Sequence, residues 1–98
     1  MSHIGKNIKK IRAVRKLSQQ QFSELFSLSR TSVGAYEEER AEPKIDTLIQ
    51  IAHYFGLSID VLLTKELSVN ELYNIDQLNQ RMDKVHNIKT SKMPKIVE

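Results

Sequence analysis

Hydrophobic residues recur every three or four positions between residues 4 and 63, which predicts a series of short amphipathic helices around one core. The first helix should run from His3 to about Lys16. Its inward-facing residues should be Ile4, Ile8 and Ile11. A second helix should begin after Ser18, because serine is a favoured N-cap residue. Its inward-facing residues should be Phe22, Leu25 and Phe26.

A third helix is expected after a short turn. The turn comprises Ser27, Leu28 and Ser29, and Leu28 should fill the space between the second and third helices. Ser29 should cap the third helix, because its hydroxyl can accept a hydrogen bond from the first helical turn. The inward-facing residues of this helix should be Val33 and Tyr36.

Two more helices complete the predicted core after a loop over residues 38–44, which lacks an apolar period and contains a proline. The fourth helix should run from about Ile45 to Tyr54 and end near Gly56, because glycine often ends helices. Its inward-facing residues should be Leu48, Ile51, Ala52 and Phe55. A fifth, short helix should follow Ser58 and turn inward Ile59, Leu62 and Leu63. We therefore expect an all-α fold, with a five-helix domain over residues 1–65.

The segment 66–98 should consist of a helix over about residues 69–88 and a flexible tail. Within this helix, hydrophobic residues are spaced three, four and three positions apart, which is typical of a coiled-coil seam. They are Ile75, Leu78, Met82 and Val85. So short a seam needs a partner, either the core of its own domain or the same helix of a second subunit. We expect dimerisation, with a further contribution from the fifth helix.

Positive charge is concentrated near the N-terminus. The formal net charge is only +3, but the first 23 residues contain six basic side chains and no acidic one. They are Lys6, Lys9, Lys10, Arg12, Arg15 and Lys16. This bias favours a polyanion as the partner of the first half of the chain. The alternative is an ordinary solvated helix face.

The composition argues against several other classes of protein. The chain has no cysteine, which excludes a disulfide framework and a thiolate metal site. His3, His53 and His86 are scattered and lack companion ligands at metal spacing. No apolar run approaches the ~20 residues of a membrane span, and no signal peptide is recognisable. We therefore expect a soluble, cytoplasmic protein that is not an enzyme and needs neither metal nor cofactor.

Residues 4–63 resemble the Cro/phage-repressor type of helix-turn-helix domain, often called the XRE family. The matching positions follow one another in register without a gap. They are Ile8, Ile11, Arg12, Leu17, Ser18, Gln19, Ser29, Tyr36, Glu37, Pro43, Leu48, Ile51, Ala52, Leu57 and Ser58. The chain departs from the family at two positions that are usually glycine, which are Ser27 and Glu39. Serine can adopt a left-handed backbone at some cost, so the turn at Ser27 should survive.

The resemblance implies that the third helix lies in the DNA major groove while the second crosses the backbone. The residues opposite the buried face of the third helix would then face DNA: Arg30, Thr31, Ser32, Gly34 and Ala35. Arg30 could pair with the two acceptors of a guanine, and the small residues could meet thymine methyl groups. Gly34 would allow close approach to DNA, and the alternative is that it makes room for a neighbouring helix.

Other polar residues are candidates for contacts with DNA phosphates. They are Lys16, Gln19, Gln20, Ser29, Arg40 and Lys44. The resemblance also implies an ion pair between Arg12 and Glu37, which would tie the first helix to the end of the third. Glu38 and Glu39 are unfavourable so close to phosphates, and they oppose contacts from this loop.

We therefore expect a sequence-specific transcriptional regulator, more specifically a repressor, that binds an inverted repeat in double-stranded DNA as a homodimer. The alternative from another class is an antitoxin or other protein-interaction module, which would use the same fold to hold a protein partner. The chain could also be the amino-terminal part of a longer regulator. Salt dependence discriminates the first two hypotheses, because affinity that rests on phosphate contacts falls steeply with salt.

Overall fold

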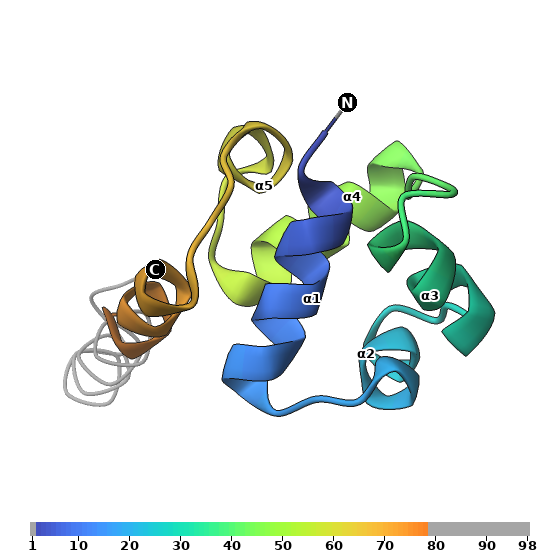
Figure 1. Ribbon diagram of the computed structural model, residues 1–98, viewed down its shortest axis with the longest axis horizontal. Coiled ribbons are helices and arrows are strands. Elements are labelled where there is room, and N and C mark those ends of the chain that lie inside the picture. The colour runs from blue at the N-terminus through green and yellow to red at the C-terminus, as the bar shows by residue number, and fades with distance from the viewer. Residues whose placement is uncertain (1, 79–98) are drawn as a thin grey trace, which may run out of the picture.

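The computed structural model describes residues 2–78, and this part of the chain folds into helices joined by loops (Figure 1). The helices are α1 (Ile4–Arg15), α2 (Gln19–Leu25), α3 (Arg30–Glu37), α4 (Ile45–Phe55) and α5 (Ile59–Thr64). A further helix, which we call the C-terminal helix, covers residues 69–78. The expected all-α fold is confirmed. Within residues 2–78, no helix has both the length and the apolar character needed to cross a membrane.

Serine side chains begin α2, α3 and α5, as their positions in the sequence predicted. The hydroxyl of Ser18 accepts the backbone N–H of Gln21 at 3.0 Å, and the Gln21 side chain accepts the backbone N–H of Ser18 at 2.8 Å. Ser29 and Ser58 accept the equivalent backbone bonds at 3.0 and 3.1 Å. These bonds satisfy donors that the first turn of a helix leaves without a partner.

One hydrophobic core lies between the five helices, and most of the predicted inward-facing residues are in it. The buried ones are Ile4, Ile8, Ile11, Phe22, Phe26, Val33, Tyr36, Ile51, Ala52, Phe55 and Leu62. Leu28, Leu48 and Leu63 are partly buried against this core. Gly56 ends α4 with a left-handed backbone, φ 70°, as expected.

The prediction is wrong for two residues, Leu25 and Ile59, which are not buried in the core. The side chain of Leu25 is 40% exposed and that of Ile59 is 36% exposed. Leu25 is the last residue of the seven-residue α2, and Ile59 is the first residue of the six-residue α5. Helices of two turns contain too few periodic positions to fix the buried face at their ends.

A buried asparagine joins α1 to the chain that follows α5. The side-chain amide of Asn7 donates to the carbonyl oxygens of Leu62 at 2.7 Å and Lys65 at 2.8 Å. Its side-chain oxygen accepts the backbone N–H of Leu67 at 3.1 Å. Asn7 therefore satisfies the main chain at the end of α5, where the backbone would otherwise be buried without partners.

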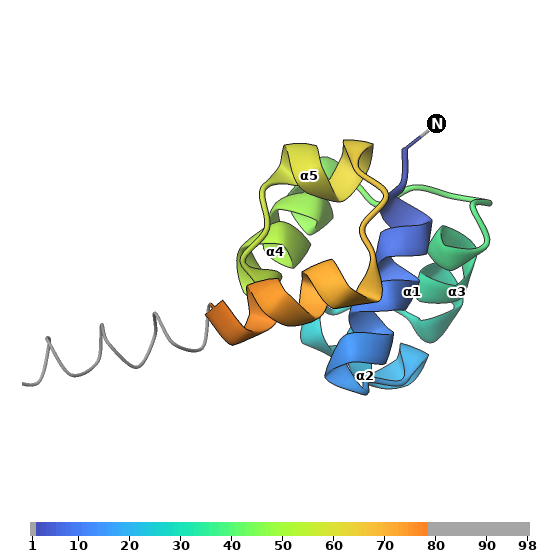
Figure 2. The same ribbon diagram turned by 60° about the vertical axis from the view of Figure 1, so that its left-hand side comes forward.

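The C-terminal helix and α3 lie on opposite sides of α1 (Figures 1 and 2). The first turn of the C-terminal helix is capped by Ser68 and Glu71, whose side chains each accept the other's backbone N–H at 3.0 Å. Leu67 and Leu72 are buried in the same core as α1. The division of the chain near Lys65 stays a prediction, but apolar packing continues beyond that residue.

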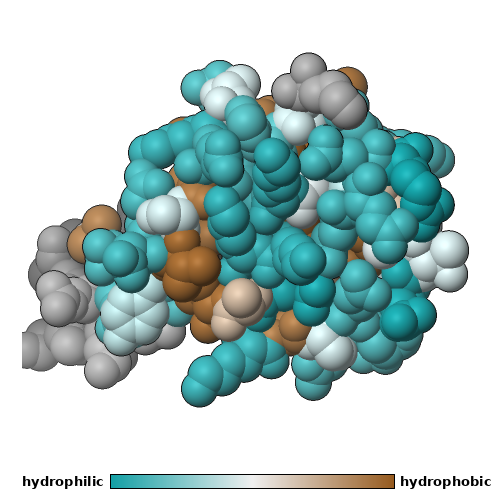
Figure 3. Space-filling model, viewed as in Figure 1, coloured by the Kyte–Doolittle hydropathy of each residue, from teal (hydrophilic) through white to brown (hydrophobic). Residues whose placement is uncertain are grey.

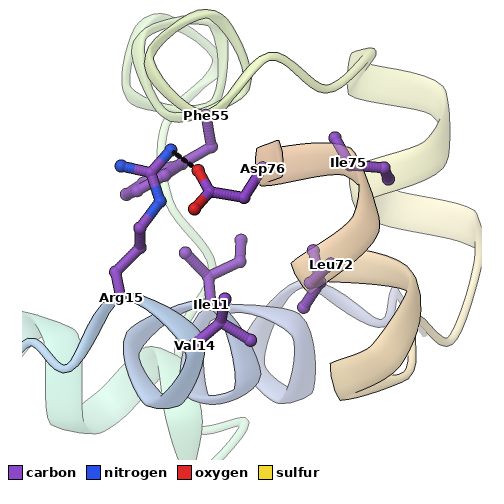
Figure 4. A pocket seen from close by; sticks show the side chains of 7 residues that line it. All are labelled: Ile11, Val14, Arg15, Phe55, Leu72, Ile75 and Asp76. Atoms are coloured by element: carbon purple, nitrogen blue, oxygen red, sulfur yellow. Dashed lines mark ion pairs between the residues drawn. The ribbon is translucent and has the colours of Figure 1, made fainter. Parts of the chain in front are cut away.

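An ion pair fixes the C-terminal helix over the core (Figure 4). A carboxylate oxygen of Asp76 lies 2.5 Å from Nη2 of Arg15. The guanidinium carbon of Arg15 in turn lies 5.1 Å from the centre of the Phe55 ring, which adds a cation–π contact. These three side chains help to line a small cavity between α1, α4 and the C-terminal helix. The C-terminal helix is thus tied to α1 by charge as well as by apolar packing.

The predicted coiled-coil seam begins on this helix. Ile75 is half-buried and lines the small cavity, so it faces its own domain. Leu78 is 57% exposed and is available to a second molecule. Met82 and Val85 lie outside the described residues. Of the four predicted seam residues, the structure therefore describes Ile75 and Leu78, and dimerisation stays a prediction.

Candidate nucleic-acid interface

The outer edge of α3 is at the surface. Val33 and Tyr36 turn into the core and hold the helix in place. On the other side, Arg30 and Thr31 are exposed, whereas Ser32, Gly34 and Ala35 are half-buried. The residues predicted to face DNA are thus accessible, with one long cationic side chain at the start of the helix and small side chains along it.

The first turn of α3 is closed by two serines. The hydroxyl of Ser29 accepts the backbone N–H of Ser32 at 3.0 Å and donates to the Ser32 hydroxyl at 2.9 Å. The Ser32 oxygen therefore accepts one bond at the helix start, and its own O–H remains for another acceptor. Arg30 and Thr31 between these serines take no part in the cap, which leaves their side chains free to reach outward.

The start of α2 lies beside α3 at Gly34. A methyl group added to Gly34 would stand 3.9 Å from both terminal atoms of the Gln19 side-chain amide, which is ordinary van der Waals contact. The same amide donates to Oε1 of Glu37 at 3.1 Å. Glycine is therefore not required at this position by packing within residues 2–78. Because Gly34 has no side chain, it leaves room on the exposed edge of α3.

A salt bridge braces the end of α3 against α1. Nε and Nη2 of Arg12 donate to the two carboxylate oxygens of Glu37 at 2.6 and 2.9 Å. Nη1 of Arg12 also donates to the carbonyl oxygen of Leu17, at 2.9 Å, in the connection to α2. The hydrogen bond to Glu37 raises the pKa of Arg12 and outweighs the opposing effect of burial. One guanidinium thus holds α1, the α1–α2 connection and α3 in a fixed relation.

A close backbone approach reinforces this brace, and sequence reasoning missed it. A methyl group on Gly5 would overlap the carbonyl oxygen of Tyr36 and stand 3.1 Å from its carbonyl carbon. The first turn of α1 therefore packs directly on the last turn of α3. The signal available in the sequence was a glycine inside an otherwise strong amphipathic helix, because interior glycines usually have a packing or functional reason.

Two residues with a left-handed backbone conformation lie at positions where the resembled family usually has glycine. Ser27, between α2 and α3, has φ 55°, and Glu39, after α3, has φ 62°. A left-handed backbone costs a residue with a side chain roughly 1–2 kcal/mol, so both turns keep their shape at some expense in stability. The turn at Ser27 survives as expected. At Glu39 the chain also brings an acidic side chain to the end of α3.

The remaining residues predicted to contact DNA differ in whether their side chains are already bonded to another residue. Gln20 donates to Glu24 at 3.0 Å on the exposed face of α2. Arg40 pairs with Glu38 at 2.8 Å, so its charge is largely balanced locally. Lys16 and Lys44 are exposed, at the end of α1 and before α4. Neither forms an ion pair with another of residues 2–78, so both are available to an outside anion.

The chain is similar in sequence to known proteins. Residues 5–68 match the sequence profile of a family described as a helix-turn-helix domain. The chain is 34% identical over 68 residues to the immunity repressor protein of Bacillus phage phi105, an alignment covering 69% of this chain and 47% of that protein. It is 32% identical over 68 residues to the control protein C.SmaI of Serratia marcescens, covering 69% of this chain and 81% of that protein.

A third relative comes from a prophage. The SPbeta prophage-derived uncharacterized HTH-type transcriptional regulator YonR of Bacillus subtilis strain 168 is 36% identical over 59 residues, covering 60% of this chain and 55% of that protein. The chain thus spans about half the length of the phage repressor and of this prophage protein. A crystal structure of a transcriptional regulator from Listeria innocua has the same fold, with a TM-score of 0.62 and 22% identity over 96% of this chain and 95% of that chain.

Proposed function

Because the chain belongs to the Cro/phage-repressor (XRE) type of helix-turn-helix transcriptional regulators, we propose that it binds double-stranded DNA with α3 in the major groove and represses transcription. The observation that carries this proposal is the outer edge of α3, which is accessible and rigidly braced. The Arg12–Glu37 salt bridge and the hydrogen bond from the Gln19 amide to Glu37 fix the end of the helix. Such preorganisation lowers the ordering cost that binding would otherwise incur.

The residues along this edge suggest how bases are recognised. Arg30 is the one long donor, and its guanidinium can form two hydrogen bonds with a guanine. Thr31 and Ala35 present methyl groups, which suit thymine methyls, while Gly34 allows close approach. Ser32 would contribute mainly as a hydrogen-bond donor, because its oxygen already accepts a bond from Ser29. We therefore expect a half-site with one essential guanine and a preference for thymine nearby.

Phosphate contacts would position the protein on either side of the groove. Lys16 and Lys44 are available for them directly. Gln19, Gln20 and Ser29 already donate to Glu37, Glu24 and Ser32, so they would contact phosphates only by exchanging or sharing those bonds. Arg40 would act only if its bond with Glu38 opens. The acidic residues after α3 oppose binding to phosphates, so specific base contacts should account for a large part of the affinity.

A homodimer would place two copies of α3 on an inverted repeat, with half-site centres about 34–36 Å apart. The proposed contact is the predicted seam of Ile75, Leu78, Met82 and Val85 together with α5. In it Leu78, Met82 and Val85 would meet the second subunit, while Ile75 packs against its own domain. Leu78 supports this, because a leucine exposed on a docked helix can be buried by a second subunit. Replacing Leu78 by Glu should give a folded monomer in analytical ultracentrifugation, and a dimer of unchanged affinity would contradict the proposed seam.

A second candidate function is favoured by an apolar groove between α2 and α4. It is lined by Leu25, Phe26, Ile49, Gln50, His53 and Tyr54. Three of these hydrophobic side chains are well exposed: Leu25, Ile49 and Tyr54. This groove would suit a protein partner, as an antitoxin or interaction module requires.

The experiment that separates the two functions is selection of bound sequences from a random pool of duplexes. A DNA-binding repressor should enrich a two-fold symmetric site, and its affinity for that site should fall steeply as salt rises. A pure protein-interaction module should enrich no sequence and bind duplexes weakly at any salt concentration. Enrichment of an unsymmetrical site would support DNA binding and contradict the symmetric dimer.

A further inference from the structure

The six basic side chains near the N-terminus fall into two groups when their partners are considered. Three of them are held by groups elsewhere in the same chain: Lys10, Arg12 and Arg15. Their respective partners are the Leu67 carbonyl oxygen at 2.7 Å, Glu37 at 2.6 Å and Asp76 at 2.5 Å. These three cations stabilise the fold, so the positive charge of this region is only partly available to a polyanion.

The second group is Lys6, Lys9 and Lys16, which we call the lysine edge. All three are exposed, and none forms an ion pair with another of residues 2–78. Lys6 and Lys9 are three residues apart and share one face of α1, and Lys16 is the C-cap residue directly after that helix. The surface over α1 is largely hydrophilic on the side seen in Figure 3. The lysine edge is thus a row of uncompensated positive charge on an accessible helix face.

The lysine edge borders the end of α3. Gly5, Lys9, Arg12 and Lys16 follow one another at intervals of four, three and four residues, which places them along one stripe of α1. The backbone at Gly5 packs on the last turn of α3, and Arg12 is bonded to that same turn. Lys9 and Lys16 therefore stand beside the contact between α1 and α3, at the margin of the candidate interface.

The lysine edge is also continuous with the start of α2. Lys16 is the C-cap residue directly after α1, and Gln19 begins α2 three residues later. The Gln19 amide bonds to the same carboxylate that Arg12 holds. A DNA backbone that passes Gln19 at the groove would thus continue toward Lys16 and along α1. Exposed ammonium groups are point charges that suit phosphate oxygens.

We propose that the lysine edge binds phosphates of the DNA strand that passes Gln19, and so extends the contact beyond the base pairs that α3 reads. This inference rests on the proposed DNA-binding function and deepens it. Lys6 and Lys9 would contact phosphates outside the half-site, where they add affinity without reading sequence.

The test compares a double variant, Lys6→Gln with Lys9→Gln, with a matched control, Lys10→Gln with Lys65→Gln. Both variants lose two positive charges, but in the control these charges are already engaged with groups on the protein. Circular dichroism first establishes that each variant is folded. Affinity for the selected duplex is then measured from 50 to 200 mM salt. The slope of log affinity against log salt should fall by about two in the Lys6/Lys9 variant, because each phosphate contact contributes about 0.9.

A second arm locates the phosphates. Uncharged methylphosphonate linkages placed just outside the half-site should weaken binding of the parent protein and leave binding of the Lys6/Lys9 variant unchanged. If the parent binds with a steep salt slope and the Lys6/Lys9 variant keeps that slope, the lysine edge is not a contact although the regulator proposal stands. A parent protein that binds no duplex overturns both proposals.

Discussion

Gly5 in α1 lies directly against the carbonyl group of Tyr36 in α3, too close for any side chain at position 5. This contact brings the first turn of α1 against the last turn of α3. The candidate interface therefore depends on a residue that carries no functional group. The orientation of α3 depends on this backbone packing as well as on the Arg12–Glu37 salt bridge.

Replacing Gly5 by Ala should destabilise the domain by about 2–3 kcal/mol, because backbone atoms must move to admit the methyl group. Gly34→Ala is the matched control, since a methyl there would make only ordinary van der Waals contact with Gln19, at 3.9 Å, and alanine gains up to ~1 kcal/mol in helix propensity. Urea unfolding of both variants tests this. Equal stability of the two variants would contradict the close packing of α1 on α3.

The Arg12–Glu37 salt bridge should behave as a coupled pair. Glu37→Ala should cost about 3–5 kcal/mol, because it leaves a partly buried guanidinium without its main partner. Arg12→Ala should also be costly, and the double variant should lose clearly less than the sum of the two single losses. A double-mutant cycle in urea measures this coupling. Strictly additive losses would show that the two side chains act independently.

Ser27→Gly and Glu39→Gly should each stabilise the protein by up to about 1 kcal/mol, because glycine adopts their left-handed backbone without a steric penalty. Their effects on DNA affinity should differ. Glu39→Gly also removes a negative charge beside the end of α3 and should tighten binding, whereas Ser27→Gly should leave affinity unchanged. Thermal unfolding and duplex titration of both variants check this, and equal effects on affinity would mean that the Glu39 charge does not face DNA.

Acid should loosen the start of the C-terminal helix. Hydrogen bonds from Lys65 and then from Ser68 lower the pKa of Glu71 to about 2. A carboxylate with a lowered pKa stabilises the folded state above its unfolded pKa of about 4.3, and this contribution disappears as pH falls toward the folded value. Between pH 5 and pH 2.5 the parent should therefore lose more stability than Glu71→Gln, which keeps the cap without the charge. Parallel losses in urea unfolding at the two pH values would exclude this role for Glu71.

Local rules predicted most of the fold. Ser18, Ser29 and Ser58 marked helix starts and Gly56 marked a helix end, because capping depends only on neighbouring residues. The exposed edge of α3 followed from the burial of Val33 and Tyr36, which the helical period identifies.

Contacts between distant segments could not be predicted in the same way. Asn7 lies beside the apolar stripe of α1, three residues after Ile4, but its partners are main-chain groups more than fifty residues away, which no local pattern identifies. The partner of Arg15 is equally distant, since Asp76 lies on the C-terminal helix. For the same reason the charge pattern overstated the free positive charge of the N-terminal region. Only the fold decides which cations meet an internal partner.

The most direct measurement of the central claim is the affinity of Arg30→Ala for the duplex selected by the parent protein and for a scrambled duplex of equal length. The claim that α3 reads bases through its exposed edge predicts a loss of about 1–3 kcal/mol on the selected duplex, with relaxed preference at one guanine and unchanged affinity for the scrambled duplex. A folded Arg30→Ala variant that keeps the parent's preference at every position would contradict that claim.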